Sequence, residues 1–422
     1  MKKQLIITVM IFFALLAVSC SRQEQETTGK IKDESIECKE LQSIDLKKNG
    51  VSVTEYMDDD VNEVIYFDDD KLIYFVDKES SNPDTSNCEV YLYDKSTGEN
   101  KFIIEVSDVN ASKGDICVLG KKVYYAFFRM TDAAAYNSLM ELDLEKKTAE
   151  LIPIENATML FVDIAVTDNH VFILKRNEVD SRRTDYIVER LDGQELTEIS
   201  SVTYRAGKSE KDADEGEYYL DFVGEEDYLY LFRGSVGRED YSFLCMTENG
   251  EIKENCKIDL QDDLKLEMDD FTSLDGEEEE DSDLPWEILK NGDYYIINTL
   301  NNRNFIFRKE GNKFVKIHAP EQLGSKELTY RSKIVTVFGE RRYIFFKEIE
   351  NDSLYVFDTK TEMFGRLNVK ADGEIGEVMR NKDSQFFFSV TRKDGTDDYI
   401  LYEENIALQL CSAQQTVQVP QE

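Results

Sequence analysis

Lys71-Leu72-Ile73-Tyr74-Phe75 is a dense run of apolar and aromatic residues just after a turn, and it decides the fold because similar runs recur along the chain. Six further runs share its character: residues 122–126 (KVYYA), 170–174 (HVFIL), 228–232 (YLYLF), 294–297 (YYII), 342–346 (RYIFF) and 385–388 (QFFF). Consecutive runs lie about 45 to 50 residues apart, with two longer intervals. A period of this length indicates one structural unit repeated about seven times.

Each run has similar neighbours on both sides. An apolar strand precedes it, and an alternating strand follows and turns into a fourth, as in residues 90–94 (VYLYD), 96–99 (STGE) and 102–104 (FII). Four-stranded units that recur in this way bury both faces when they are arranged radially. The sequence therefore predicts an all-β protein, a β-propeller of about seven four-stranded blades. Six or eight blades are the alternatives, because residues 51–56 and 406–410 either complete a blade or only close the ring.

The turn after the third strand carries a resemblance to known proteins. Asp94 to Gly98 has the pattern Asp-x-x-Thr-Gly, and in this the repeats resemble bacterial propellers of the TolB-like and quinoprotein-like type. The Trp-Asp dipeptide of WD40 blades, the double glycine of kelch blades and the Asp-box of sialidases do not occur. The resemblance implies the propeller fold and assigns a role to no residue.

The first twenty residues predict where the protein resides. Lys2 and Lys3 precede an apolar run, residues 5–18, which is too short to span a bilayer with margin, and Ser19 precedes Cys20. Residues 17–20 (AVSC) resemble the lipobox of bacterial lipoproteins. This resemblance implies that Cys20 is lipidated and becomes the first residue of the mature chain. We therefore expect a lipid anchor on the extracytoplasmic side of a membrane in the cell envelope.

These features predict four segments. Residues 1–19 form a signal peptide, residues 20–44 a lipidated N-terminus and polar tether, residues 45–411 the β-propeller and residues 412–422 a C-terminal tail. The formal net charge of -37 would make nucleic-acid phosphates and anionic headgroups repel the chain, so no nucleic-acid partner is expected.

Motifs for catalysis and for metal or cofactor binding are largely missing from the sequence. His170 and His318 are the only histidines, and no phosphate-binding glycine loop or Gly-x-Ser-x-Gly elbow occurs. His170 is expected at a blade turn. Residues 261–283 carry twelve acidic residues against one basic residue, which we interpret as a solvated charge run. No metal, cofactor or catalytic residue is predicted.

Six cysteines remain besides Cys20, and an exported chain permits disulfides among them. Cys245 and Cys256 flank a predicted Asn-Gly hairpin turn, which would place Cys245 opposite Glu254 and Cys256 diagonally across on the same face. Cys38 and Cys411 lie just outside the two ends of the repeats, where a bridge would lock the ring. Free buried thiols are the alternative for both pairs.

Strand alternation predicts two different faces. The first and third turns of every unit share one face, called the tight-turn face below, whereas the second turns and the links between units share the other, called the loop face. The loop face carries the longest connections, including residues 201–216 and 259–285. Because binding residues tend to lie on loops over a rigid scaffold, we expect the functional surface there. The favoured function is a binding or scaffolding module for a protein or glycan, and the alternative is a polysaccharide or peptide hydrolase or lyase with carboxylates in the channel.

We predict that replacing Cys20 with Ala gives a protein that no longer partitions into detergent, because no acyl chain is then attached. Phase partitioning of the wild type and the variant measures this. A Cys20→Ala protein that still enters the detergent phase would contradict lipidation at this residue.

Overall fold

The structure is a computed structural model, and it describes the strands and their shorter connections. The described residues are 39–40, 44–45, 51–52, 63–68, 70–80, 85–110, 116–130, 135–155, 162–207, 214–235, 240–258, 285–299, 304–311, 313–317, 332–334, 343–348, 354–367, 369–380, 385–393, 395 and 397–403. Every regular element in these ranges is a β-strand. Over the same ranges, no helix has the length and apolar character needed to cross a membrane.

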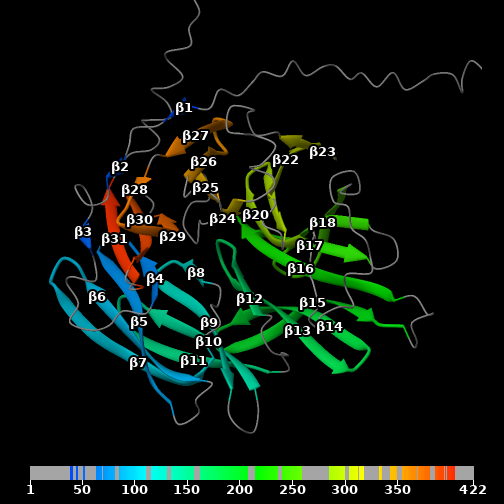
Figure 1. Cartoon of the computed structure of the whole chain (residues 1–422). Coiled ribbons are helices and arrows are strands. Elements are labelled where there is room, and N and C mark those ends of the chain that lie inside the picture. The colour runs from blue at the N-terminus through cyan, green and yellow to red at the C-terminus, as the bar shows by residue number, and fades with distance from the viewer. Residues whose placement is uncertain are drawn as a thin grey trace, which may run out of the picture. The chain divides into compact units, whose positions relative to one another are not determined.

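The described strands group into consecutive four-stranded units, named here repeats 1 to 7 (Figure 1). Repeat 1 holds β4 (Glu63–Phe67), β5 (Lys71–Glu79), β6 (Ser86–Asp94) and β7 (Glu99–Val109). Repeat 2 holds β8 (Ile116–Leu119), β9 (Lys122–Met130), β10 (Ala135–Asp143) and β11 (Thr148–Ile154). Repeat 3 holds β12 (Val162–Val166), β13 (Val171–Asp180), β14 (Arg183–Asp192) and β15 (Glu195–Arg205).

Repeats 4 to 7 continue the series. Repeat 4 holds β16 (Glu215–Glu225), β17 (Tyr228–Ser235), β18 (Asp240–Thr247) and β19 (Ile252–Ile258). Repeat 5 holds β20 (Pro285–Asn291), β21 (Tyr294–Thr299), β22 (Asn304–Glu310) and β23 (Lys313–Ile317). Repeat 6 holds β24 (Ser332–Ile334), β25 (Tyr343–Glu348), β26 (Leu354–Asp358) and β27 (Met363–Leu367). Repeat 7 holds β29 (Gly373–Arg380), β30 (Gln385–Arg392), β31 (Asp397–Glu403) and the early strand β3 (Val51–Ser52).

Within each repeat the four strands form an antiparallel meander. The chain is therefore an all-β protein with the repeat organisation of a β-propeller, as the sequence predicted. The apolar runs used to find the period are the second strands of the repeats. The number of blades in the whole chain stays a prediction, because the seven repeats are counted over the described residues alone.

The second strands are apolar on both faces because both faces are covered. Five consecutive residues of β5, Leu72 to Val76, are buried, and six consecutive residues of β9, Val123 to Phe128, are buried. Side chains alternate between the two faces of a strand, so consecutive buried residues require a neighbour on each side. The third strand β6 instead alternates between more and less buried positions. Each repeat therefore depends on the repeats beside it.

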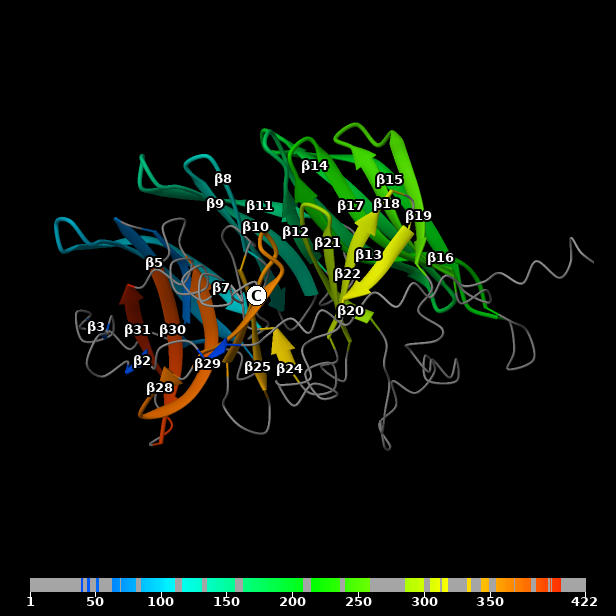
Figure 2. The same ribbon diagram turned by 90° about the horizontal axis from the view of Figure 1, so that it is seen from above.

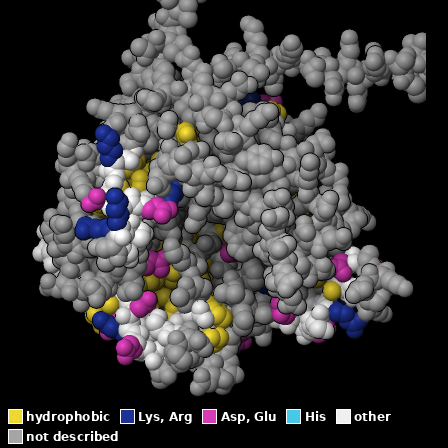
Figure 3. Space-filling view, in the orientation of Figure 1, with side chains coloured by type: hydrophobic (Ala, Val, Ile, Leu, Met, Phe, Trp, Pro, Cys, Tyr) yellow, Lys and Arg dark blue, Asp and Glu magenta, His cyan; other side chains and the backbone are white. Residues whose placement is uncertain are grey.

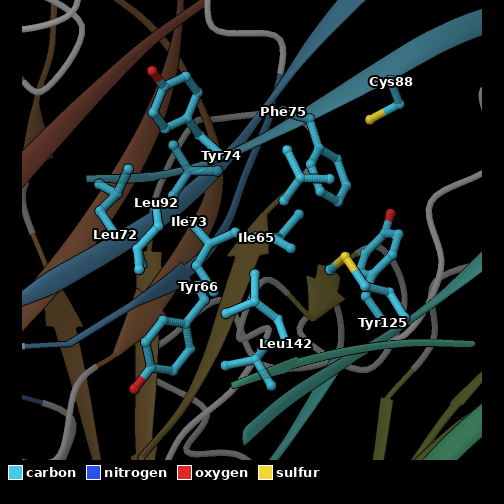
Figure 4. Packing of buried hydrophobic residues seen from close by; sticks show 14 of the residues in the cluster. Ile65, Tyr66, Leu72, Ile73, Tyr74, Phe75, Cys88, Leu92, Tyr125 and Leu142 are labelled. Carbon is cyan, nitrogen blue, oxygen red and sulfur yellow. The ribbon is translucent and has the colours of Figure 1, made fainter. Parts of the chain in front are cut away.

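The buried clusters show which repeats pack together. Clusters join repeats 1 with 2, 2 with 3, 3 with 4, 4 with 5 and 6 with 7. Figure 4 shows part of the first of these, where Phe75 of β5 and Tyr125 of β9 lie with ring centroids 5.0 Å apart. Repeats 5 and 6 meet where the ring of Tyr294 lies edge-on to Phe357, with centroids 5.7 Å apart.

The last repeat also packs against the first. Phe387 of β30 belongs to the cluster of repeat 1 and stacks on Phe67 of β4, with ring centroids 5.2 Å apart. Figures 1 and 2 both show these strands side by side. Strand β3 adds to this closure, because Val51 pairs with Leu401 of repeat 7 while the chain then continues into repeat 1. The contacts between repeats thus form a complete cycle.

Two further strands precede β3. Strand β1 (Lys39–Glu40) pairs in parallel with β27, and β2 (Ile44–Asp45) pairs in parallel with β28 (Val369–Lys370). These pairings begin earlier in the chain than residue 45, where the repeats were predicted to start. The predicted strand at residues 406–410 lies outside the described residues.

A recurrent turn follows the third strand in repeats 1, 2 and 6. In repeat 1 the Asp94 carboxylate accepts hydrogen bonds from the backbone N–H groups of Ser96 and Thr97, and Gly98 N donates to the Asp94 carbonyl at 2.8 Å. In repeat 2 Asp143 accepts the equivalent bonds. The fourth residue after the Asp has a positive φ in each case: +70° at Gly98, +54° at Lys147 and +53° at Glu362. Only the first of these residues is a glycine. Repeats 2 and 6 therefore share the backbone conformation of the Asp94–Gly98 turn without sharing its Asp-x-x-Thr-Gly sequence.

We predict that Phe387→Ala lowers the free energy of unfolding by about 3 to 5 kcal/mol, because it removes a fully buried ring where the last repeat packs on the first. Phe102→Ala is the matched control, since Phe102 is 48% exposed and its loss should change stability by roughly 0.5 kcal/mol or less. Urea unfolding of both variants measures the effect. Equal, small changes in the two variants would contradict closure through Phe387.

Candidate functional site

Repeats 3 and 4 form the best-described part of the loop face. Their strands are long: β13 and β14 have 10 residues each, and β15 and β16 have 11 each, against five in β26. The link between these repeats continues as a β-ladder, because Tyr204 pairs with Gly216 and Arg205 with Glu215. Figure 2 shows the extended strands β14, β15 and β16 in green. The ends of these strands therefore present side chains at fixed positions.

Four tyrosines gather where these strand ends meet, and we call them with their polar neighbours the tyrosine cluster: Arg176, Tyr186, Tyr204, Asp214, Tyr218 and Tyr241. The ring of Tyr186 on β14 lies 6.3 Å from the ring of Tyr218 on β16. Tyr218 also hydrogen-bonds with Tyr241 of β18. The cluster thus joins repeat 3 to repeat 4 at the loop face.

Asp214 fixes the base of the link between the two repeats. It accepts a hydrogen bond from the Tyr204 hydroxyl and another from the backbone N–H of Gly207 at 2.7 Å. Burial, and then the hydrogen bond to Asp214, raise the pKa of Tyr204, so its phenol stays a neutral donor at physiological pH. Residues 207 and 214 are thereby held together at the two ends of the segment between them.

Gly216 is required by the close approach of the two strands in this link. Its φ is +115°, and a Cβ atom there would lie 2.1 Å from the carbonyl oxygen of Thr203. No other residue type fits such a position without a backbone shift. The sequence therefore fixes where the link leaves the sheet and enters β16.

An arginine–aspartate pair lies on the other side of the same strands. Arg183 donates two hydrogen bonds to Asp185, at 3.0 and 2.9 Å, and the Thr203 hydroxyl donates to Asp185 at 2.7 Å. Burial alone would raise the pKa of Asp185, but the hydrogen bonds from Arg183 and Thr203 lower it overall. Arg205 is exposed beside this pair. The Arg183 guanidinium is thus oriented by Asp185 while its side chain remains partly open to solvent.

A second polar cluster joins repeats 3 and 4 on the tight-turn face. Nδ1 of His170 lies 3.1 Å from Oε2 of Glu248, and Oε1 of the same carboxylate accepts a hydrogen bond from the Thr167 hydroxyl. Arg190 donates to the side-chain oxygen of Asn249 at 2.7 Å. His170 lies in the turn before β13, as expected from the sequence. These contacts join repeat 3 to the turn between β18 and β19 of repeat 4, and we assign them a structural role.

The predicted cysteine pairs have different outcomes. Cys245 lies opposite Glu254, as predicted, and Cys256 lies opposite Phe243, with a register shift beside Cys245. Both are free thiols in this structure, and burial raises the pKa of Cys245, which keeps that thiol protonated. A bond between them stays a prediction. Cys20, Cys38, Cys411, His318 and residues 261–283 lie outside the described residues.

Several of the described carboxyl groups are stabilised by hydrogen bonds and cations of the protein itself. Within the described ranges, no group of three or more His, Cys, Asp or Glu side chains is placed to hold a metal ion. Among the described carboxyl groups whose pKa departs from its ordinary value, each has a lowered pKa: Asp94, Asp143, Asp185, Asp192, Glu248, Glu362 and Glu374. Each of these groups is therefore held ionised by its neighbours.

No protein-family model matches the chain. No curated protein matches it in sequence. Solved structures similar to it include the β-propeller domain of the trilobed protease from Pyrococcus furiosus, at 14% identity and a TM-score of 0.42, with 70% of this chain and 82% of that chain covered. Virginiamycin B lyase from Staphylococcus aureus is similar at 12% identity and a TM-score of 0.45, with 84% of this chain and 98% of that chain covered. Identities and TM-scores this low assign neither a family nor an activity.

We predict that Asp214→Ala speeds tryptic cleavage at Lys208 and Lys211 about tenfold, because local opening becomes easier by roughly 1.4 kcal/mol or more when two charge-assisted hydrogen bonds are lost. Asp212→Ala removes the same charge from the same link and serves as the control. Mass spectrometry of the fragments over time measures both rates. Similar rates in the two variants would show that Asp214 does not hold the link.

Proposed function

We propose that the protein is a lipid-anchored β-propeller of the bacterial cell envelope, of the TolB-like or quinoprotein-like kind, that binds a protein or glycan partner through its loop face. The observation that carries this proposal is the tyrosine cluster with its neighbouring arginines at the projecting ends of repeats 3 and 4.

The chemistry of this region favours recognition. Tyrosine and arginine are the residues most enriched where binding energy concentrates at interfaces, since each combines a large contact area with a polar group. Tyr186 and Tyr204 are half-buried; packing holds Tyr186 in place, and the hydrogen bond to Asp214 holds Tyr204. Side chains ordered before binding lose less conformational entropy when the partner arrives.

The described carboxyl groups favour binding over hydrolysis. A glycosidase that works with two carboxylates needs one of them protonated near neutral pH, which requires a raised pKa. The shifted carboxyl groups of the described residues all have lowered pKa values, for example Asp185 beside Arg183 and Glu248 beside Thr167. The binding module therefore remains the better supported of the two functions.

Anchoring rests on the N-terminal sequence. Residues 1–20 carry the features of a bacterial lipoprotein signal, and two or three acyl chains at Cys20 make attachment effectively permanent. A partner held by the loop face would thereby be retained at the membrane surface.

We predict that the double variant Arg183→Ala with Arg205→Ala binds the partner about tenfold more weakly. This change in Kd corresponds to roughly 1.4 kcal/mol of binding free energy. Lys121→Ala with Lys146→Ala is the control, because both are exposed basic residues in the tight turns of repeat 2. The delipidated mature chain is tested on a glycan array and in pull-downs from envelope extract, and each retained ligand is then titrated.

Two outcomes would contradict the proposal. Binding by the double variant at the wild-type level, together with loss of binding in Lys121→Ala with Lys146→Ala, would move the site to the tight-turn face. Turnover of an arrayed polysaccharide or peptide by the wild-type protein would instead support the hydrolase or lyase.

A further inference from the structure

The strands that precede β3 have a definite direction relative to the repeats. Lys39 pairs with Gly365 and Glu40 with Arg366, and then Ile44 pairs with Val369 and Asp45 with Lys370. Both pairings are parallel, so the segment from β1 to β2 runs alongside β27 and β28 in the same sense. The direction of β27 thus fixes the side from which the chain arrives.

Strand β27 starts at the tight-turn face. It follows the turn in which Lys360 N and the Thr361 hydroxyl donate hydrogen bonds to Asp358, and this is the third turn of repeat 6. As a fourth strand, β27 runs from that turn toward the loop face. Because β1 is parallel to it, the chain reaches Lys39 from the tight-turn face.

The interval between the predicted lipid anchor and β1 is short. From Cys20 to Lys39 the chain advances nineteen residues, and a tether of that length, as the polar sequence predicts, would have an end-to-end distance of about 25 Å. Strand β6 alone has nine residues, which corresponds to roughly 30 Å between the two faces. An anchor attached on the side of the tight-turn face would have to pass along the whole depth of the repeats before the loop face could meet the bilayer.

Charge favours the same orientation. The net charge of -37 makes an anionic surface repel the chain as a whole. Exposed basic side chains lie in tight turns of repeats 2 and 6: Lys121 and Lys146 in repeat 2, and Lys360 in repeat 6. Acidic and basic side chains lie next to one another on the surface in Figure 3. Exposed acidic turn residues of repeat 4 are Glu226 and Asp227, whereas repeat 6, which pairs with β1, presents Lys360.

We infer that the tight-turn face faces the phospholipid headgroups, and that the loop face points away from the membrane. This orientation rests on the proposed lipid anchor at Cys20. It deepens the proposed function, since it directs the tyrosine cluster toward partners approaching from outside the bilayer.

Energy transfer from two label positions in repeat 1 tests the orientation. Ser96→Cys lies in the turn after β6, and Glu79→Cys lies at the far end of β5, and both positions are exposed. The lipidated full-length protein is labelled with a donor and reconstituted in phosphatidylcholine vesicles that contain phosphatidylglycerol and a headgroup-labelled acceptor. The wild type labelled in parallel gives the background from the native cysteines.

We expect strong transfer from the label at residue 96 and much weaker transfer from the label at residue 79. Lys121→Glu together with Lys146→Glu should reduce transfer from residue 96, whereas Arg182→Glu on the loop face should leave it unchanged. Equal transfer from the two labels, or stronger transfer from residue 79, would overturn the orientation while leaving the anchor intact. A protein that does not stay with the vesicles would overturn the anchor, and the orientation with it.

Discussion

The fold depends on covering both faces of each second strand. Leu72 to Val76 in β5 and Val123 to Phe128 in β9 are buried without a break, and a single four-stranded sheet cannot hide both of its faces. Each repeat therefore needs two neighbours, and the first and last repeats supply one another through Phe67 and Phe387. The turns, the lateral hydrogen bonds and the position of β3 all serve this mutual coverage.

The fold class could be predicted from the sequence because the burial requirement leaves a visible pattern. Runs such as residues 71–75 mark strands covered on both sides, and alternation in residues 90–94 marks the strand beside them. The order of the strands within a repeat could be predicted, and so could the register that places Cys245 opposite Glu254. The turn at Lys147 was harder to recognise, because its left-handed conformation is not accompanied by a glycine.

The sequence predicted only the face of the fold on which the candidate site lies, and not the residues that form it. Strand alternation places the long connections on one side, but the period says nothing about contacts between different repeats. The approach of Tyr186 to Tyr218 arises from the lateral packing of repeats 3 and 4, and the hydrogen bonds from Tyr204 and Gly207 to Asp214 join the two ends of the link between them. A tyrosine near one end of β14, β15 and β16, with an aspartate at the far end of the link, is the only signal the sequence carries for these contacts.

The pairing of β3 with β31 also constrains how the molecule is made. Val51 is synthesised long before Leu401, yet the two lie opposite each other in one sheet. Loop closure over such a distance is slow, so native assembly must wait until nearly all of the polypeptide has been synthesised. A chain cut short during synthesis would keep the edges of repeats 1 and 7 uncovered, and proteases could recognise it by that exposed apolar surface. Completeness of the chain is thereby a condition for its survival.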